Sequence, residues 1–167
     1  RRLDAGRDVC NAIVCANNDP YLSGVDLVVS PIMSVGTATL EEIRNALIDF
    51  RSSGKFIVSY NDTYTQATYY LSSVADRIYL NPAGGLAWQG MAAQALFFKG
   101  TLDKLGVEPE IIRHGKYKSA IEPYTSDKMS PENREQTESL VHAVWDNVVA
   151  GVSEARGIAA AALPQYA

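Results

Sequence analysis

The sequence from Lys55 to Leu80, KFIVSYNDTYTQATYYLSSVADRIYL, decides the fold class of this protein. Its first six residues, 55–60, are rich in β-branched and aromatic side chains and predict a strand. Residues 63–75 predict a helix, and residues 77–80 predict a second strand. A strand, a helix and a strand joined by short loops form a right-handed βαβ unit with parallel strands. This stretch therefore predicts an α/β domain with a mainly parallel sheet.

The residues before this stretch predict the same alternation of helices and strands. Residues 8–17 carry apolar side chains at helical spacing, and residues 24–29 predict a short strand. A capping box, Thr39 followed three residues later by Glu42, predicts the start of the next helix. That helix has a single apolar stripe and is expected to end at Gly54. The stripe consists of Leu40, Ile43, Leu47 and Phe50.

The residues after this stretch predict a turn, a helix and a further strand. Residues 81–85, Asn-Pro-Ala-Gly-Gly, are typical of a turn. Residues 94–105 predict a helix with Gly106 just past its end. Residues 110–114 predict a fourth strand, and a polar, turn-rich stretch follows it.

The last part of the sequence predicts a long helix. Ser130 as the cap, Pro131 at the first position and Glu132 in the first turn are typical of a helix start. Gly157 is expected to end this helix, and the Ala-rich residues beyond it have no evident packing partner. The expected apolar face consists of Leu140, Val141, Val144, Trp145, Val148 and Val152. We therefore predict one domain over residues 1–157, incomplete at its N-terminus, and a tail or the start of a linker over residues 158–167.

Composition and charge narrow the function classes. Hydrophobic residues make up 47% of the 167 residues and charged residues 20%, which excludes intrinsic disorder for the bulk of the chain. The net charge of -4 argues against nucleic acid as a partner, because proteins that bind it present a basic face. No apolar run approaches the ~18–20 residues of a membrane span, and no signal peptide is expected. The chain begins at Arg1 without Met, so we expect it to be a piece of a longer protein.

Motifs for cofactors and metals are absent from the sequence. It contains no phosphate loop of the Walker type, no dinucleotide-binding glycine motif and no G-x-S-x-G nucleophile elbow. Two histidines and two cysteines are too few for a metal cluster, so we expect neither a cofactor nor a metal. We interpret Cys10 and Cys15 as small buried apolar side chains. We interpret the tyrosines from Tyr60 to Tyr79 as core residues with wet hydroxyls rather than a base-stacking strip.

Several long, ordered motifs carry a resemblance to a known family. They include Tyr-Tyr-Leu-Ser-Ser-Val-Ala-Asp-Arg-Ile-Tyr-Leu-Asn-Pro at residues 69–82 and Gly-Lys-Tyr-Lys-Ser-Ala-Ile-Glu-Pro at residues 115–123. Met-Ser-Pro-Glu-Asn-Arg-Glu at residues 129–135 and Asn-Asp-Pro at residues 18–20 add to them. On these residues the chain resembles the signal peptide peptidase A (protease IV) family, in its long, doubled bacterial form.

The resemblance implies a fold, a reaction and a catalytic residue. The fold is of the ClpP/crotonase type, in which stacked βαβ units carry helices on the outside. The reaction is peptide hydrolysis by a Ser–Lys dyad, with the lysine in the first half of the doubled protein and the serine in the second. The catalytic lysine directly precedes Ser-Ala in the motif, which assigns the general base to Lys118. Neighbouring Tyr117, Ser119 and Glu122 are candidates for supporting roles around its amine.

The position of the nucleophile departs from the family pattern. Family members with the serine have Ser-Gly-Gly before the tyrosine pair, whereas this chain has Gln66-Ala67-Thr68 before Tyr69. An amide cannot attack a peptide carbonyl, so we predict that this chain is the lysine-bearing, N-terminal half and is inactive alone. Ser119 cannot replace the serine, because neighbouring side chains of an extended segment point to opposite faces.

A lysine can act as the base only if its environment lowers its pKa. The ordinary value of about 10.4 leaves the amine protonated near neutral pH. Burial in an apolar cleft disfavours the ammonium and can lower the pKa by up to ~3–5 units. We expect Lys118 to be desolvated in this way once the cleft is complete, whereas Lys116 stays in water.

The resemblance also implies partners and a location. The expected partners are apolar, extended peptides such as cleaved signal peptides, the serine-bearing C-terminal half of the same protein, and further copies in a homo-oligomer. The expected location is the bacterial cytoplasmic membrane, with the catalytic domain outside the cytoplasm. We expect Trp88 and residues 91–98 at a rim or interface, with core packing as the alternative. Two other functions stay open: a non-catalytic assembly module of the same fold, and a crotonase-like acyl-CoA enzyme.

Overall fold

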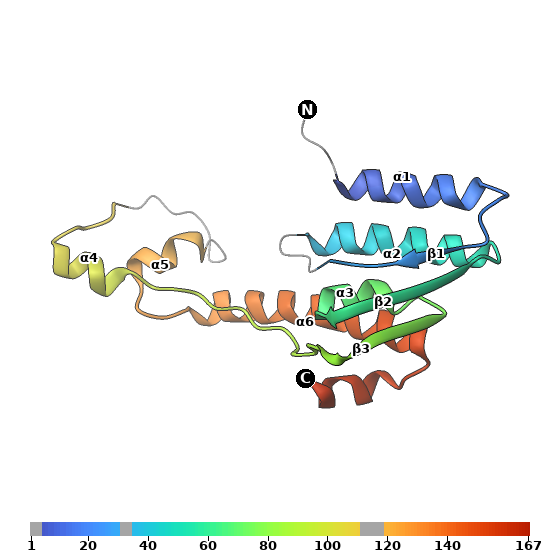
Figure 1. The fold of residues 1–167 in the computed structure, drawn as a ribbon. Coiled ribbons are helices and arrows are strands. Elements are labelled where there is room, and N and C mark those ends of the chain that lie inside the picture. Colours follow the sequence, from blue (N-terminus) through green and yellow to red (C-terminus); the bar gives the residue numbers. More distant parts are fainter. Residues whose placement is uncertain (1–4, 31–34, 111–118) are drawn as a thin grey trace. The chain divides into compact units, whose positions relative to one another are not determined.

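The computed structural model describes residues 5–30, 35–110 and 119–167 (Figure 1). Its elements follow one another as α1 (Ala5–Asn18), β1 (Gly24–Leu27), α2 (Thr37–Ser52), β2 (Phe56–Tyr64), α3 (Gln66–Ser72), β3 (Arg77–Leu86), α4 (Lys99–Leu105), η1 (Ser119–Ile121), α5 (Glu122–Thr125), α6 (Pro131–Arg156) and η2 (Ala160–Tyr166). The chain divides into two compact units. Unit 1 comprises Arg1–Gly90 and Asn147–Ala167, and unit 2 comprises Met91–Asp146.

Unit 1 is built on a parallel sheet with the strand order β1-β2-β3. Both strand pairs are parallel and are connected through helices, which confirms the βαβ pattern predicted from the sequence. The core lies on one face of this sheet, where Ile57 of β2 packs with Leu47 and Phe50 of α2. Helix α1 lies alongside α2 (Figure 1) and adds the partly buried Ile13 to this core. The α/β fold class is therefore confirmed.

The predicted start of α2 is wrong by three residues. The helix begins at Thr37, and its N-cap is Gly36, which makes no side-chain cap hydrogen bond. Thr39 consequently lies inside the first turn and does not cap the helix. The apolar stripe is correct, because Leu40, Leu47 and Phe50 are buried. The end is also correct, since Gly54 has a φ of 89° just past the helix, a conformation that favours glycine.

The second strand and the helix after it divide differently from the prediction. Strand β2 continues to Tyr64, so helix α3 begins at Gln66. Thr65 caps this helix, and the hydroxyl oxygen of Thr68 accepts a hydrogen bond from the backbone N–H of Thr65. The capping box therefore lies at the start of α3 and not at the start of α2. Its sequence is Thr-x-x-Thr, which a search for the usual Ser/Thr-x-x-Glu/Gln pattern does not find.

The predicted turn at residues 81–85 is instead part of strand β3. The pairing with β2 shifts register between Asn61 and Thr63, which lets β3 continue through Pro82 to Leu86. Gly84 makes this pairing feasible: a Cβ added to it would lie 1.7 Å from the carbonyl oxygen of Asp62. A strand with a shift in its pairing register can thus contain glycines that, from the sequence alone, predict a turn.

In unit 2 the helix predicted over residues 94–105 is shorter than expected. Helix α4 begins at Lys99, and residues 94–98 form neither a helix nor a strand. Gly106 ends the helix as predicted, with a φ of 68°. Of the predicted fourth strand, Glu110 is not in a strand, and residues 111–114 lie outside the described residues. The stretch expected to be turn-rich contains the two short helices η1 and α5.

Helix α6 begins and ends as the sequence predicts. The Oγ of Ser130 accepts a hydrogen bond of 3.1 Å from the backbone N–H of Asn133, and Gly157 follows the helix with a φ of 64°. Its expected apolar face is buried only in its second half, at Val148 and Val152, whereas Leu140 is 65% exposed. The reason is that only the second half of the helix packs within unit 1.

The Ala-rich end of the chain does have a packing partner. Residues Ala160–Tyr166 form the 3-10 helix η2, and its Leu163 is buried. The indole N–H of Trp88 donates a hydrogen bond of 2.9 Å to the carbonyl oxygen of Leu163.

The interpretation of the two cysteines as buried side chains was wrong. Cys15 is exposed and Cys10 is only partly buried, and both lie on α1, a helix with no buried residues.

Candidate active site

The residue predicted as the general base, Lys118, and its neighbour Tyr117 lie outside the described residues. The structure describes the chain directly after them. Ser119 begins the 3-10 helix η1, and Glu122 begins helix α5. The described part of the candidate site therefore consists of the elements that hold the end of the lysine motif.

Glu122 ties the lysine motif to the start of the long helix α6. Its side chain is 3% exposed. One carboxylate oxygen accepts the backbone N–H of Ser130 at 3.1 Å and the side-chain amide of Asn133 at 2.8 Å. The other accepts the hydroxyl of Ser130 at 2.5 Å. A negative charge at a helix N-terminus is also favoured by the helix dipole. The hydrogen bonds described here give Glu122 a positioning role, and its predicted role beside the amine of Lys118 stays a prediction.

Residues 91–98 are joined to the same helix α5. The backbone N–H of Phe98 donates a hydrogen bond of 2.6 Å to the carbonyl oxygen of Pro123. The rings of Phe98 and Tyr124 stack with their centroids 6.1 Å apart. Met91, Leu96 and Phe98 are 39%, 64% and 44% exposed. Core packing, the alternative for this segment, is therefore wrong for these three side chains.

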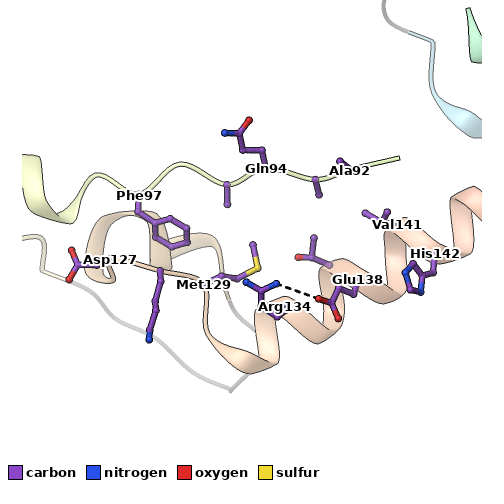
Figure 2. Close-up of a pocket in the computed structure, with 13 residues that line it drawn as sticks. Ala92, Gln94, Phe97, Asp127, Met129, Arg134, Glu138, Val141 and His142 are labelled. Atoms are coloured by element: carbon purple, nitrogen blue, oxygen red, sulfur yellow. Dashed lines mark hydrogen bonds and ion pairs between the residues drawn. The ribbon is translucent and has the colours of Figure 1, made fainter. Parts of the chain in front are cut away.

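A groove of about 550 Å³ lies between this segment and the first half of α6 (Figure 2). Phe97, Met129 and Val141 supply apolar surface, and Arg134 forms an ion pair of 3.5 Å with Glu138 on the helix. The remaining lining residues are Ala92, Ala93, Gln94, Ala95, Asp127, Lys128, Thr137 and His142. The groove thus combines apolar surface with charged groups along the helix.

Sequence reasoning missed the groove residues on α6. The signal was available, because Arg134, Glu138 and His142 recur every four residues and share one helix face with Val141. Without a known partner across the groove, the same spacing is also typical of a solvated helix face.

Gln66, which the family resemblance predicts at the position of the nucleophile, has a structural role in unit 1. Its side-chain oxygen accepts hydrogen bonds from the backbone N–H groups of Gly90 at 3.1 Å and of Gln89 at 3.4 Å. The ring of Tyr69 packs edge-on against Trp88, with the centroids 6.1 Å apart. The Gln66 side chain thus fixes the last residues of unit 1 before the chain enters unit 2.

The serines near Gln66 are buried and hydrogen-bonded. The hydroxyl of Ser72 accepts a hydrogen bond of 2.9 Å from Ser59, and both side chains are 0% exposed. The hydroxyl of Ser73 donates to the carbonyl oxygen of Tyr70 at 2.8 Å and accepts from Arg44 at 2.7 Å. These serines stabilise the interior and cannot reach a peptide substrate from it.

Arg44 is a buried cation that the sequence did not reveal. It is 4% exposed and donates to the carbonyl oxygens of Tyr70 at 2.6 Å and Gly151 at 2.5 Å. Its guanidinium lies 4.6 Å from the centre of the Tyr70 ring. Burial lowers the pKa of Arg44 below its ordinary value, while Tyr70 and then Glu154 act in the opposite direction. The residue joins α2, α3 and α6 within unit 1.

In residues 5–30, 35–110 and 119–167, no three His, Cys, Asp or Glu side chains come together as a metal site. None of the helices in this part of the chain combines the length and the apolarity needed to cross a bilayer.

Comparison with known proteins identifies the family. The profile of peptidase family S49 matches residues 49–167, which include the lysine motif and Gln66. The chain belongs to peptidase family S49, as its resemblance to the signal peptide peptidase A family implied.

The relatives that the chain matches are longer proteins. It is 40% identical over 151 residues to Protease 4 of Haemophilus influenzae, a match that covers 90% of this chain and 25% of that protein. It is 37% identical over 151 residues to Protease 4 of Salmonella typhi, covering 90% of this chain and 24% of that protein. It is 37% identical over 144 residues to the chloroplastic serine protease SPPA of Arabidopsis thaliana, covering 86% of this chain and 21% of that protein. The chain thus spans about a quarter of the length of these relatives.

Proposed function

We propose that this chain is the lysine-bearing part of a serine peptidase that hydrolyses apolar, extended peptides, with Lys118 as the general base. The observation that carries the proposal is the 37–40% identity to proteins named Protease 4 over 90% of the chain. The family match includes the Tyr-Lys-Ser-Ala motif around Lys118.

The proposed chemistry is acyl transfer to a serine. The neutral amine of Lys118 accepts the proton of the serine hydroxyl as its oxygen attacks the peptide carbonyl. The ammonium then donates this proton to the departing amine, and the acyl group stays on the serine as an ester. Water hydrolyses the ester, with the lysine amine again accepting a proton, and the free serine is regenerated.

The geometry around the lysine motif supports this role. A catalytic base works best when its supporting residues hold it in place. Glu122, four residues after Lys118, is buried and accepts hydrogen bonds from Ser130 and Asn133 at the start of α6. Ser119 opens the short helix that leads into this anchor. The motif is therefore anchored at Glu122, four residues after Lys118 in the sequence.

The nucleophile comes from another part of the enzyme in this proposal. Gln66 occupies the nucleophile position, and its amide oxygen accepts hydrogen bonds from Gln89 and Gly90. A serine-bearing domain of the same protein, or of a further copy in a homo-oligomer, supplies the hydroxyl. The chain on its own is then inactive, and the complete enzyme acts on cleaved signal peptides at the bacterial cytoplasmic membrane, outside the cytoplasm.

A variant of the full-length protein tests the base. Lys118→Ala is expected to lower the turnover of a fluorogenic apolar peptide by ~10²–10⁴-fold or more, because a lost base cannot activate the serine. Lys116→Ala is the matched control, two residues away in the same motif, and is expected to retain most of the activity. Full activity of Lys118→Ala, or a loss only in Lys116→Ala, would overturn the proposal.

A second candidate function is a non-catalytic assembly module, favoured by the structural use of Gln66. An assembly module has no need of a desolvated lysine. It therefore predicts that Lys118→Ala leaves turnover unchanged while substitutions at the contacts between subunits reduce it. The same pair of lysine variants separates the two candidates.

A further inference from the structure

Among the described residues of unit 1, no helix or strand covers one face of the parallel sheet. The face toward the helices carries Ile57 and Ser59, both 0% exposed. On the opposite face, Phe56 and Tyr60 of β2 and Tyr79 of β3 are 51%, 43% and 48% exposed. The interpretation of Tyr60 and Tyr79 as core residues was therefore wrong. Parallel sheets are almost always covered on both faces, which makes this aromatic face a candidate interaction surface.

The packing of Phe56 keeps this face flat. Phe56 pairs with Gly24 of the neighbouring strand. A Cβ on Gly24 would lie 2.5 Å from two carbons of the Phe56 ring, so the ring lies over the glycine. An aromatic ring that lies across a strand offers its face to a partner, and so supports sheet-on-sheet packing.

The charges on this face follow the strand register. Asp26 of β1 pairs with Val58 of β2, and Val58 pairs with Arg77 of β3. One row across the sheet therefore has an exposed acid on one edge strand, an apolar residue in the centre and an exposed base on the other edge strand. The next row of this face pairs Tyr60 with Tyr79.

This row is complementary to itself under a two-fold rotation about an axis along β2. Such a rotation places β1 of one copy over β3 of the other, so Asp26 faces Arg77 twice, while Val58 and Tyr60 face their own counterparts. A two-fold interface uses the same patch on both subunits, which requires this kind of self-complementarity. Sheets that pack face to face keep their strand directions within about 30°, as this axis also requires.

We propose that the bare face of the β1-β2-β3 sheet binds a second copy of this chain, with Asp26 of each copy paired to Arg77 of the other. At the edge of the face, Asp62 accepts hydrogen bonds from the Tyr60 hydroxyl at 3.0 Å and from the Asn81 side chain at 2.8 Å. This gives the apolar centre a polar rim, as protein interfaces have. The interface does not depend on the proposed function, because it uses no residue of the lysine motif or the groove.

Charge reversal tests the pairing by sedimentation velocity of the 167-residue chain. The unmodified chain is expected to be a dimer. Asp26→Arg and Arg77→Asp, each alone, are expected to raise the dimer Kd about tenfold, because each places like charges opposite one another twice per dimer. The double variant restores both pairs and is expected to restore the Kd. Asp49→Arg, on the exposed side of α2, is the matched control and should leave the Kd unchanged.

A second variant probes the centre of the interface. Val58→Lys is expected to give a monomer, because it buries two like charges against each other. Far-UV circular dichroism and the thermal transition show whether each variant is folded. An unmodified chain that is monomeric, with its sheet face open or covered in another way, would overturn the proposal. So would single and double charge variants with equal Kd values.

Discussion

The two compact units of this chain are organised by different kinds of interaction. In the described residues, the buried apolar side chains all belong to unit 1. In unit 2 the buried side chain is the carboxylate of Glu122, whereas Leu140 and Leu96 are largely exposed. Burial of apolar area stabilises unit 1, and a polar anchor orders unit 2. The stability of the chain is thus concentrated in one unit, and the proposed chemistry in the other.

The largest expected effect comes from removing a core ring of unit 1. Phe50 is 0% exposed, and Phe50→Ala should lower the free energy of unfolding by about 3–5 kcal/mol. The comparison is Phe98→Ala in unit 2, where the ring is 44% exposed and stacks on Tyr124, for which about 1 kcal/mol is expected. Urea unfolding measures both. Equal losses would break the contrast between the units.

A smaller loss is expected from the buried cation of unit 1. Arg44→Met keeps an unbranched aliphatic stem but removes the guanidinium, which leaves the carbonyl oxygens of Tyr70 and Gly151 without this donor. About 2–4 kcal/mol of stability should be lost. The control is Arg51→Met on the same helix: its ion pair with Asp76 is partly exposed, so less than about 1 kcal/mol is expected. If Arg44→Met leaves the free energy of unfolding unchanged, the buried charge of Arg44 gives no net stability.

A local effect is expected at the anchor of unit 2. Glu122→Gln leaves one acceptor oxygen for the donors of Ser130 and Asn133. The hydrogen exchange of amides in the first turn of α6 should speed up about tenfold, with little change in global unfolding. Thr125→Val, which removes one hydrogen bond to Ile121, is the control within α5 and should leave α6 exchange unchanged. Unchanged hydrogen exchange in Glu122→Gln would show that Glu122 does not order the start of α6.

The smallest effect concerns pH and the rim of the bare sheet face. Hydrogen bonds from Asn81 and then from Tyr60 lower the pKa of Asp62 below its ordinary value. The folded state therefore gains stability from the carboxylate above the unfolded pKa, and loses it as the pH falls through the folded pKa. Because Asp62 is exposed, only a small shift in Tm is expected between pH 5 and pH 2. In Asp62→Asn this component should vanish, and a pH profile that is unaltered would contradict the assignment.

Part of the fold followed from local sequence patterns. The apolar stripe of α2 and the β-branched strand at Ile57 predicted the core, because burial selects those side chains at fixed periods. The Ser130 cap and the glycines after α2, α4 and α6 predicted helix ends, since these signals act within a few residues.

The errors lie where contacts distant in sequence override the local signal. The turn predicted around Gly84 became strand because the backbone of Asp62 approaches it closely. Residues 94–98 have helical composition but form no helix, and the backbone N–H of Phe98 donates a hydrogen bond to the carbonyl oxygen of Pro123 in α5. Tertiary contacts of this kind outweigh the intrinsic helix and strand propensities, which differ by only about a few tenths of a kcal/mol per residue.

The sequence by itself determined the α/β class and the family, because the order of its motifs can be read along the chain. The role of Lys118 is a proposal that rests on the same motifs. The tertiary structure decided what individual polar residues do. Gln66 holds the backbone of Gly90, Glu122 anchors helix α6, and Arg44 joins three helices. The physical reason is that a buried polar group must find its partner in space, and that partner is often far away along the chain. No residue pattern within one segment records such a partner.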